Sequence, residues 1–138
     1  MSDKDYSSTP LWRKLGIKEG SRVLIDGAPA GFRASLEPLP ARVRLTTRSS
    51  KPFDVIVVFQ PKAAGLERRL RELMPVLDPA GGLWIAYPKK SSMIETDLTF
   101  DAVQGAGLGA GLVDNKRCAI DVDWSAVRFV YRLKNRPR

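Results

Sequence analysis

The feature that constrains this chain most is the apolar run Phe-Asp-Val-Ile-Val-Val-Phe over residues 53–59. Such a run, ended by Pro61, is typical of a strand covered on both faces. Residues 62–77 carry apolar side chains at three- and four-residue steps, which predicts a helix. A second apolar run over residues 83–87 predicts the next strand. Strand, helix and strand in this order indicate a parallel sheet with helices on its faces.

The rest of the pattern extends this architecture. An apolar run predicts a strand at 23–25, and the alternation of Val43 and Leu45 with arginines predicts a half-exposed, peripheral strand at 41–47. A short helix is expected that is capped by Thr9 and stopped by Gly16, and one helical turn is expected over 32–36. A later helix is expected to be capped by Thr99 and to end in the glycines from Gly105 onward. Two final strands are expected at 112–120 and 126–133. The turn between the last two strands is too short for a parallel crossover, so it predicts an antiparallel hairpin.

These elements together predict an α/β fold of the Rossmann-like type, a three-layer α/β/α sandwich with a mainly parallel sheet and a C-terminal antiparallel hairpin. The strand at 41–47 is either parallel or antiparallel to the others. A parallel strand requires the short link to residues 53–59 to run back along the sheet, which it can do only if it is extended at about 3.3 Å per residue. Within the helix at 62–77, Glu67 and Arg71 are spaced to form an ion pair. Asp78 to Gly82 is expected to end that helix as a turn.

Length and composition fit one globular domain. The chain has 138 residues, of which 43% are hydrophobic and 28% charged. We expect a mobile polar arm at 1–8, a single Rossmann-like domain over 9–133 and a basic tail at 134–138. The one cysteine, Cys118, allows no intrachain disulfide, and no apolar run approaches the roughly 20 residues of a membrane span. A cytoplasmic protein with no membrane contact is the simplest prediction.

The absence of histidine limits the chemistry. It removes Ser-His-Asp and Cys-His catalysis in their usual form and the commonest transition-metal ligand, so we expect no metal site. The net charge of +8 favours an anionic partner, although a solvated basic surface explains it as well. The oligomeric state is left open by the sequence.

The best candidate ligand-binding residues follow two predicted strands. Gly27, Gly31 and Phe32 follow the strand at 23–25, and Lys89, Lys90 and Ser91 follow the strand at 83–87. In open α/β sheets, ligands bind at the carboxyl ends of the strands, at the point where the strand order reverses. The glycines would admit a ligand beside the backbone, and the lysines and the hydroxyl would bind a phosphate or carboxylate.

Other motifs have simpler explanations. The sequence Gly-Ala-Gly-Leu-Gly-Ala over 105–110 matches a dinucleotide-binding pattern, but it follows a helix instead of a strand, so we interpret it as a connection. Turn chemistry accounts for Asp121 and Asp123, packing for Trp124, and Cys118 is expected to be an inert thiol. The basic tail and the arginines at 68, 69 and 71 would contact nucleic acid only non-specifically, which is a weaker prediction.

Residues 53–90 resemble the second half of class I S-adenosylmethionine-dependent methyltransferases. The similar pieces are Phe-Asp followed by an apolar run at 53–57, Leu-Asp-Pro-Ala-Gly-Gly at 77–82, and the apolar strand that ends at Pro88. The resemblance implies the methyltransferase fold. Two positions depart from the family pattern: Pro29 lies in the first glycine-containing turn, and the second strand ends in Thr46-Thr47-Arg48 without the carboxylate that holds ribose hydroxyls.

The whole chain also resembles a bacterial domain-of-unknown-function family, number 3052. The similar pieces are Ser-Thr-Pro-Leu at 8–11, Lys-Leu-Gly-Ile at 14–17, Pro-Lys-Lys at 88–90, Val-Asp-Asn-Lys at 113–116 and Trp-Ser at 124–125. This resemblance implies no assigned activity.

Three functions therefore remain open, and neither the cofactor nor enzymatic activity follows from the sequence. The leading hypothesis is a domain that binds a small anionic or nucleotide-like ligand. The first alternative is a divergent S-adenosylmethionine-dependent methyltransferase. The second is an interaction protein with a non-specific nucleic-acid contact.

Overall fold

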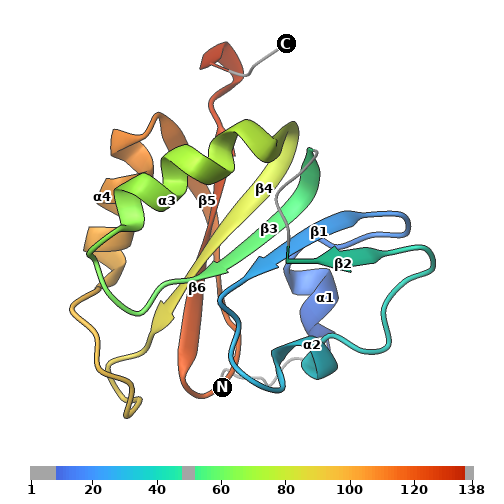
Figure 1. Ribbon diagram of the computed structural model, residues 1–138, viewed down its shortest axis with the longest axis horizontal. Helices are drawn as coiled ribbons and strands as arrows, with labels where there is room; N and C mark the ends of the chain where they lie inside the picture. Colours follow the sequence, from blue (N-terminus) through green and yellow to red (C-terminus); the bar gives the residue numbers. More distant parts are fainter. Residues whose placement is uncertain (1–8, 48–51, 136–138) are drawn as a thin grey trace.

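A computed structural model of the chain describes residues 9–47 and 52–135. One six-stranded sheet carries helices on both faces (Figure 1). The elements are, in chain order, α1 (Leu11–Lys14), β1 (Arg22–Asp26), α2 (Phe32–Ser35), β2 (Arg44–Thr46), β3 (Phe53–Phe59), α3 (Leu66–Leu73), the 3-10 helix η1 (Met74–Val76), β4 (Leu77–Pro88), α4 (Phe100–Gly109), β5 (Leu112–Ala119), β6 (Trp124–Tyr131) and the 3-10 helix η2 (Leu133–Asn135). The polar arm at 1–8 and residues 136–138 of the basic tail lie outside the described residues.

The strand order is β2-β1-β3-β4-β6-β5. The first four strands of this order are parallel to one another, and β6 runs antiparallel to both β4 and β5. The predicted fold class, a mainly parallel sheet with a C-terminal antiparallel hairpin, is confirmed. β4 is therefore the strand at which the sheet changes from parallel to antiparallel.

The direction of β2, which the sequence left open, is parallel. Among the described residues, β2 pairs only with β1, with Arg22 opposite Arg44 and Val23 opposite Leu45. It forms one edge of the sheet, and Arg44 is exposed while Leu45 is half-buried. The prediction of a peripheral, half-exposed strand is confirmed, although β2 is shorter than the predicted range.

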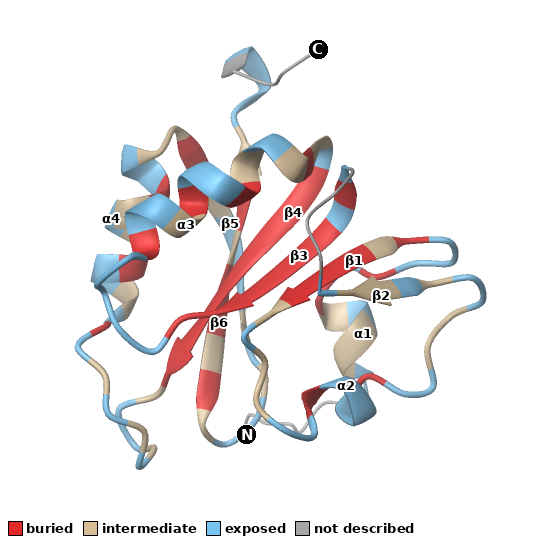
Figure 2. Ribbon diagram, viewed as in Figure 1, coloured by how far each residue is buried: buried red, intermediate tan, exposed pale blue. Residues whose placement is uncertain are grey.

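The sheet separates two apolar layers, and its central strands are buried on both faces (Figure 2). On β3, Ile56 and Val58 point toward α3 and α4, whereas Val55 and Val57 point toward α1 and α2. This burial on both sides is why β3 reads as a continuous apolar run. None of the helices in the described part of the chain has the length and apolar character that a membrane crossing requires.

Helix α3 is shorter than the predicted range of 62–77. It begins at Leu66, and Gly65 precedes it with a φ of +84°. Residues 62–65 stay outside the helix because the buried Gln60 side chain binds two carbonyls in this segment: Gln60 Nε2 donates to Lys62 O over 2.8 Å and to Ala64 O over 3.2 Å. The ion pair on α3 joins Arg68 to Glu72 at 3.9 Å, so the prediction of a pair between Glu67 and Arg71 is wrong.

The predicted turn from Asp78 to Gly82 lies inside β4, so this prediction is also wrong. β4 begins opposite Phe53 at Leu77, and its register shifts before Gly82 pairs with Val55. Gly81 is needed within this irregularity because a Cβ there would lie 2.7 Å from Asp54 O. The Pro-Ala-Gly sequence therefore produces a bulge in a strand instead of a chain reversal.

Helix α4 continues through the glycines that were predicted to end it, and it stops at Gly109. Gly107 lies inside the helix and packs directly on Phe129, so this position requires glycine: a Cβ here would overlap the Phe129 ring. The Thr99 cap is confirmed, since its side chain accepts from Ala102 N over 3.1 Å. The N-cap of α1 is Pro10, not Thr9 as predicted.

Candidate functional site

The carboxyl ends of β1, β3 and β4 lie together at one edge of the sheet (Figure 1). From β1 the chain continues to β2 on one side, and from β3 it continues to β4 on the other side. The loops after β1 and β3 therefore diverge at this edge, which is where open α/β sheets bind ligands. We call the loop Asp26–Gly31 and the loop 60–65 together the switch-point site.

The loop after β1 depends on its two glycines. Gly27 has a φ of +73°, and a Cβ there would lie 3.2 Å from Phe59 O, so the loop packs closely on the end of β3. Gly31 has a φ of +89° and is the N-cap of α2. Both glycines are exposed. Their backbone is thus accessible from solvent, and ligand binding at this loop stays a prediction.

Phe32, the third candidate of this loop, is a core residue. Only 4% of its surface is exposed. Its ring meets Phe59 edge-to-face at 4.8 Å between centroids, and Phe59 meets Trp124 in the same way at 5.0 Å. These three rings pack together in the apolar layer, and Gly27 of the loop lies against Phe59. Trp124 is packed, as predicted.

Asp26, the last residue of β1, accepts a hydrogen bond from Arg69 Nη1 of α3. Both side chains are about one-third exposed. The contact places an anion and a cation side by side at the carboxyl end of β1. The sequence did not indicate this pair: Arg69 was considered only for a nucleic-acid contact and Asp26 not at all, because they are 43 positions apart and only the topology brings them together.

The structure places Lys89 and Lys90 in a second location at the same sheet edge. They line a cavity of about 600 Å³ together with residues 94–99, which we call the β4–α4 cavity. Gly27, Gly31 and Phe32 do not line this cavity, and neither does Ser91. The predicted residues therefore share one edge of the sheet but divide between two neighbouring places.

The hairpin residues have structural roles. Asp121 Oδ1 accepts from Asp123 N over 2.8 Å and from Trp124 N over 2.9 Å, so turn chemistry is confirmed for Asp121. Burial raises the pKa of the Cys118 thiol to about 11, despite an opposing effect of the Lys14 charge. A thiol with such a pKa is a poor nucleophile at neutral pH, as the sequence predicted. Within residues 9–47 and 52–135, no group of three or more Cys, Asp or Glu side chains is arranged to hold a metal ion.

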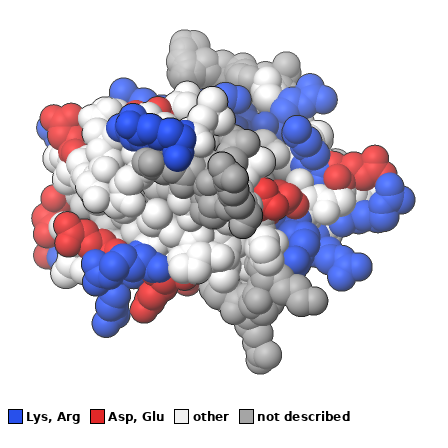
Figure 3. All heavy atoms as spheres, turned by 90° about the horizontal axis from the view of Figure 1, so that it is seen from above, with Lys and Arg blue, Asp and Glu red and all other residues white. Residues whose placement is uncertain are grey.

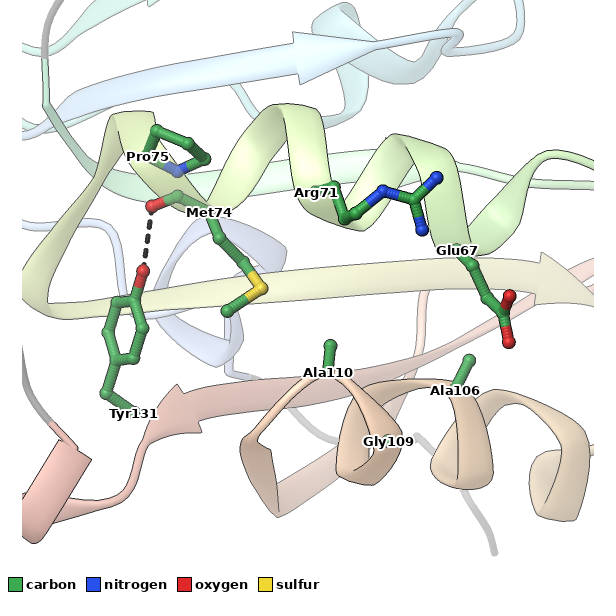
Figure 4. A pocket seen from close by; sticks show the side chains of 8 residues that line it. All are labelled: Glu67, Arg71, Met74, Pro75, Ala106, Gly109, Ala110 and Tyr131. Atoms are coloured by element: carbon green, nitrogen blue, oxygen red, sulfur yellow. Dashed lines mark hydrogen bonds between the residues drawn. The ribbon is translucent and has the colours of Figure 1, made fainter.

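A larger cavity lies between α3 and α4 (Figure 4). Its volume is about 690 Å³, and its lining includes Arg71, Met74 and Tyr131. Tyr131 Oη donates to Met74 O over 2.9 Å across one end of it. β6 runs antiparallel to β4, with Trp124 opposite Pro88 and Phe129 opposite Leu83, so Tyr131 at the end of β6 and the cavity beside it lie away from the carboxyl ends of the parallel strands.

Basic side chains do not gather in one place on the face seen in Figure 3, where Lys and Arg groups alternate with Asp and Glu. Of the three α3 arginines considered for nucleic acid, Arg68 and Arg69 have acidic partners, Glu72 and Asp26. A nucleic-acid contact stays a prediction.

Solved structures that are similar to this chain include several methyltransferases. An S-adenosylmethionine-dependent methyltransferase from Aquifex aeolicus matches with a TM-score of 0.62 and 17% identity over 86% of both chains. This is a methyltransferase-like fold. The ribosomal protein L11 methylase from Lactobacillus delbrueckii subsp. bulgaricus matches with a TM-score of 0.60 and 13% identity, over 89% of this chain and 75% of the other. Fibrillarin from Aeropyrum pernix, solved with natively bound S-adenosylmethionine, matches with a TM-score of 0.57 and 17% identity, over 88% of this chain and 69% of the other.

No protein-family model and no curated protein sequence matches the chain. At identities of 13–17%, the solved structures show the fold and leave the ligand and the reaction to be tested. The resemblance to a methyltransferase fold that the sequence indicated is confirmed at this level.

Proposed function

We propose that this protein is a divergent methyltransferase that binds S-adenosylmethionine at the switch-point site. The observation that carries the proposal is the loop Asp26–Gly31, in which a carboxylate and two accessible glycines of positive φ end the first strand of a methyltransferase-like sheet. Similar folds include proteins whose structures contain S-adenosylmethionine. The ligand supplies an activated methyl group when it is bound.

The residues of the loop suit such a ligand in part. Gly27 and Gly31 allow the backbone to approach a ligand closely, and Asp26 offers carboxylate oxygens to a hydroxyl or an ammonium group. Pro29 has no N–H to donate. At the end of β2, where a carboxylate would hold the ribose, this chain has Thr46 and Thr47, whose hydroxyls both donate and accept hydrogen bonds. We expect weaker binding than a carboxylate would give.

Arg69 adds a donor to this site. One of its N–H groups binds Asp26, and a guanidinium has five N–H donors in a planar fork. The remaining donors are available to a carboxylate, such as that of an amino-acid moiety. Asp26 and Arg69 together therefore suit a ligand that carries both an ammonium and a carboxylate.

Isothermal titration calorimetry with S-adenosylmethionine and with its demethylated product tests the proposal. We expect saturable heat with both ligands, and a loss of at least tenfold in affinity in Asp26→Asn. The matched control is Asp54→Asn, the same change at the amino end of β3, which should bind as the unmodified protein does. The folding of the protein is first verified by circular dichroism. If the folded protein then gives no heat with S-adenosylmethionine and none with its demethylated product, the proposal is refuted.

A further inference from the structure

The β4–α4 cavity is lined by two lysines, which follow β4, and by the segment 94–99, which precedes α4. Two acidic side chains also line it, Glu95 and Asp97. Both are used in contacts to the neighbouring loop: Glu95 Oε2 binds Lys62 Nζ at 3.0 Å, and Asp97 Oδ1 accepts from Ala63 N over 2.7 Å. These contacts also join the segment 94–99 to the switch-point site.

The two lysines differ from these acids. Lys89 Nζ and Lys90 Nζ make no ion pair with any residue in the part of the chain that the structure describes. The backbone that carries them is nonetheless well held. Lys89 N donates to Asp123 O over 2.8 Å, and Lys89 O accepts from Ser92 N over 3.0 Å and from Ser92 Oγ over 2.8 Å. The ammonium groups thus extend from a fixed loop and have no acidic partner among the described residues.

The hydroxyl groups of the cavity are also set up as donors. Thr96 Oγ1 accepts from Leu98 N over 3.0 Å, and Thr99 Oγ1 accepts from Ala102 N over 3.1 Å. Each oxygen is used as an acceptor, so its O–H proton is left to donate. The lining therefore offers ammonium and hydroxyl donors, which suits a group that has several acceptor oxygens and a negative charge.

We infer that the β4–α4 cavity binds a phosphate group of the molecule that is methylated. The inference deepens the proposed function. That the bound molecule accepts a methyl group rests on the proposed methyltransferase activity, whereas the phosphate site does not. β3 alone separates β1 from β4, so the two sites lie roughly 10 Å apart at a strand spacing of about 4.8 Å. A phosphorylated small molecule anchored at Lys89 and Lys90 spans that distance to the switch-point site.

Titration with inorganic pyrophosphate at constant ionic strength, followed by amide NMR, tests the phosphate site. We expect the largest shifts in residues 89–99 and a loss of at least tenfold in affinity in Lys89→Ala/Lys90→Ala. Lys89→Arg/Lys90→Arg, which keeps both charges, should restore most of the affinity. The matched control, Lys18→Ala/Lys116→Ala, removes two exposed charges elsewhere and should stay within twofold.

Other outcomes overturn the inference. Equal weakening in both alanine double variants would show that only net charge attracts the anion, and shifts outside residues 89–99 would place the anion elsewhere. S-adenosylmethionine titrations of the Lys89→Ala/Lys90→Ala protein separate the two proposals: we expect unchanged affinity there. If the protein binds pyrophosphate but not S-adenosylmethionine, the phosphate site is supported and the methyltransferase proposal is refuted. If it binds S-adenosylmethionine but not pyrophosphate, only the phosphate site is refuted.

Discussion

Trp84 Nε1 donates a hydrogen bond to the carbonyl oxygen of Leu15 over 2.9 Å, and both residues are fully buried. The bond joins β4 to the end of α1, 69 positions away. It satisfies an indole N–H and a backbone carbonyl that have no access to water. One polar contact within an apolar layer therefore adds to the packing of Leu11 and Leu15 in holding α1 on the sheet.

Trp84→Phe should destabilise the fold by about 2–4 kcal/mol, because it removes the donor, leaves the Leu15 carbonyl unpaired and opens a small cavity. Urea denaturation measures the free energy of unfolding. Trp12→Phe is the control, since Trp12 is only partly buried and contacts the Arg13 guanidinium from the surface side. Similar losses in both variants would contradict the special role of Trp84.

The glycines of α4 should respond to alanine in opposite ways. Gly107→Ala should cost at least about 2 kcal/mol, because the new Cβ overlaps the Phe129 ring. A Cβ at Gly105 or Gly109 would meet no atom within 4 Å, so alanine there should stabilise the helix by up to about 1 kcal/mol each. Thermal unfolding of the three variants checks this; a loss in all three would show that the helix needs its glycines for another reason.

Cys118 should react slowly with a disulfide reagent such as Ellman's reagent. With a pKa of about 11 in the folded protein, its thiolate fraction at pH 8 is about 100-fold smaller than that of a thiol of pKa 9. We expect the folded protein to react at least 100-fold more slowly than the protein in urea. A reaction as fast in the folded state would mean that the thiol is accessible and readily ionised.

The same thiol makes stability depend on pH. Its pKa is higher in the folded state than in the unfolded state, so the stabilisation is complete below pH 9 and is lost as the pH rises toward 11. Denaturant unfolding between pH 8 and 11 should therefore show a smaller decline for Cys118→Ala than for the unmodified protein. Burial also raises the pKa values of Tyr87 and Tyr131. If the free energy of unfolding declines equally in both proteins, such other groups dominate the loss of stability at alkaline pH.

The Asp26–Arg69 contact should be worth more than an exposed ion pair. A double-mutant cycle on Asp26 and Arg69 should give a coupling free energy of about 1 kcal/mol, since both side chains are about two-thirds buried. The cycle on Glu19 and Arg42, whose side chains are 58% and 76% exposed, should give less than about 0.5 kcal/mol. Equal couplings would show that burial at the switch-point site adds nothing to the pair.

Element order was predictable because periodicity reports burial directly. The run at 53–59 and the short hairpin turn leave few alternatives, and both are found as predicted. The predictions failed where one long-range contact decides the local structure. Gly107 is a contact point for Phe129 instead of a helix stop, and Pro79 to Gly81 lie in a strand beside β3. Neither neighbour is visible in the local sequence.

For the candidate site, the sequence predicted the location in the fold but not the contacts between the residues. Gly27 and the Lys89-Lys90 pair were identified from their position after apolar runs, and the structure puts them at one edge of the sheet. Asp26 with Arg69, and Lys62 with Glu95, come from segments whose approach depends on the strand order. An arginine on an amphipathic helix gives no sequence signal that distinguishes a ligand-site residue from a solvated one.

β6 follows every other strand in the chain, yet it lies between β4 and β5. Phe129, at the middle of β6, fills the space beneath Gly107 and is fully buried. During synthesis, α3 and α4 therefore leave the ribosome before β6, one of the two strands against which α4 packs. Until β6 has emerged, the chain exposes one edge of β4 and the apolar surface of α4 that later covers Phe129, and unpaired strand edges and exposed apolar surface of this kind favour aggregation.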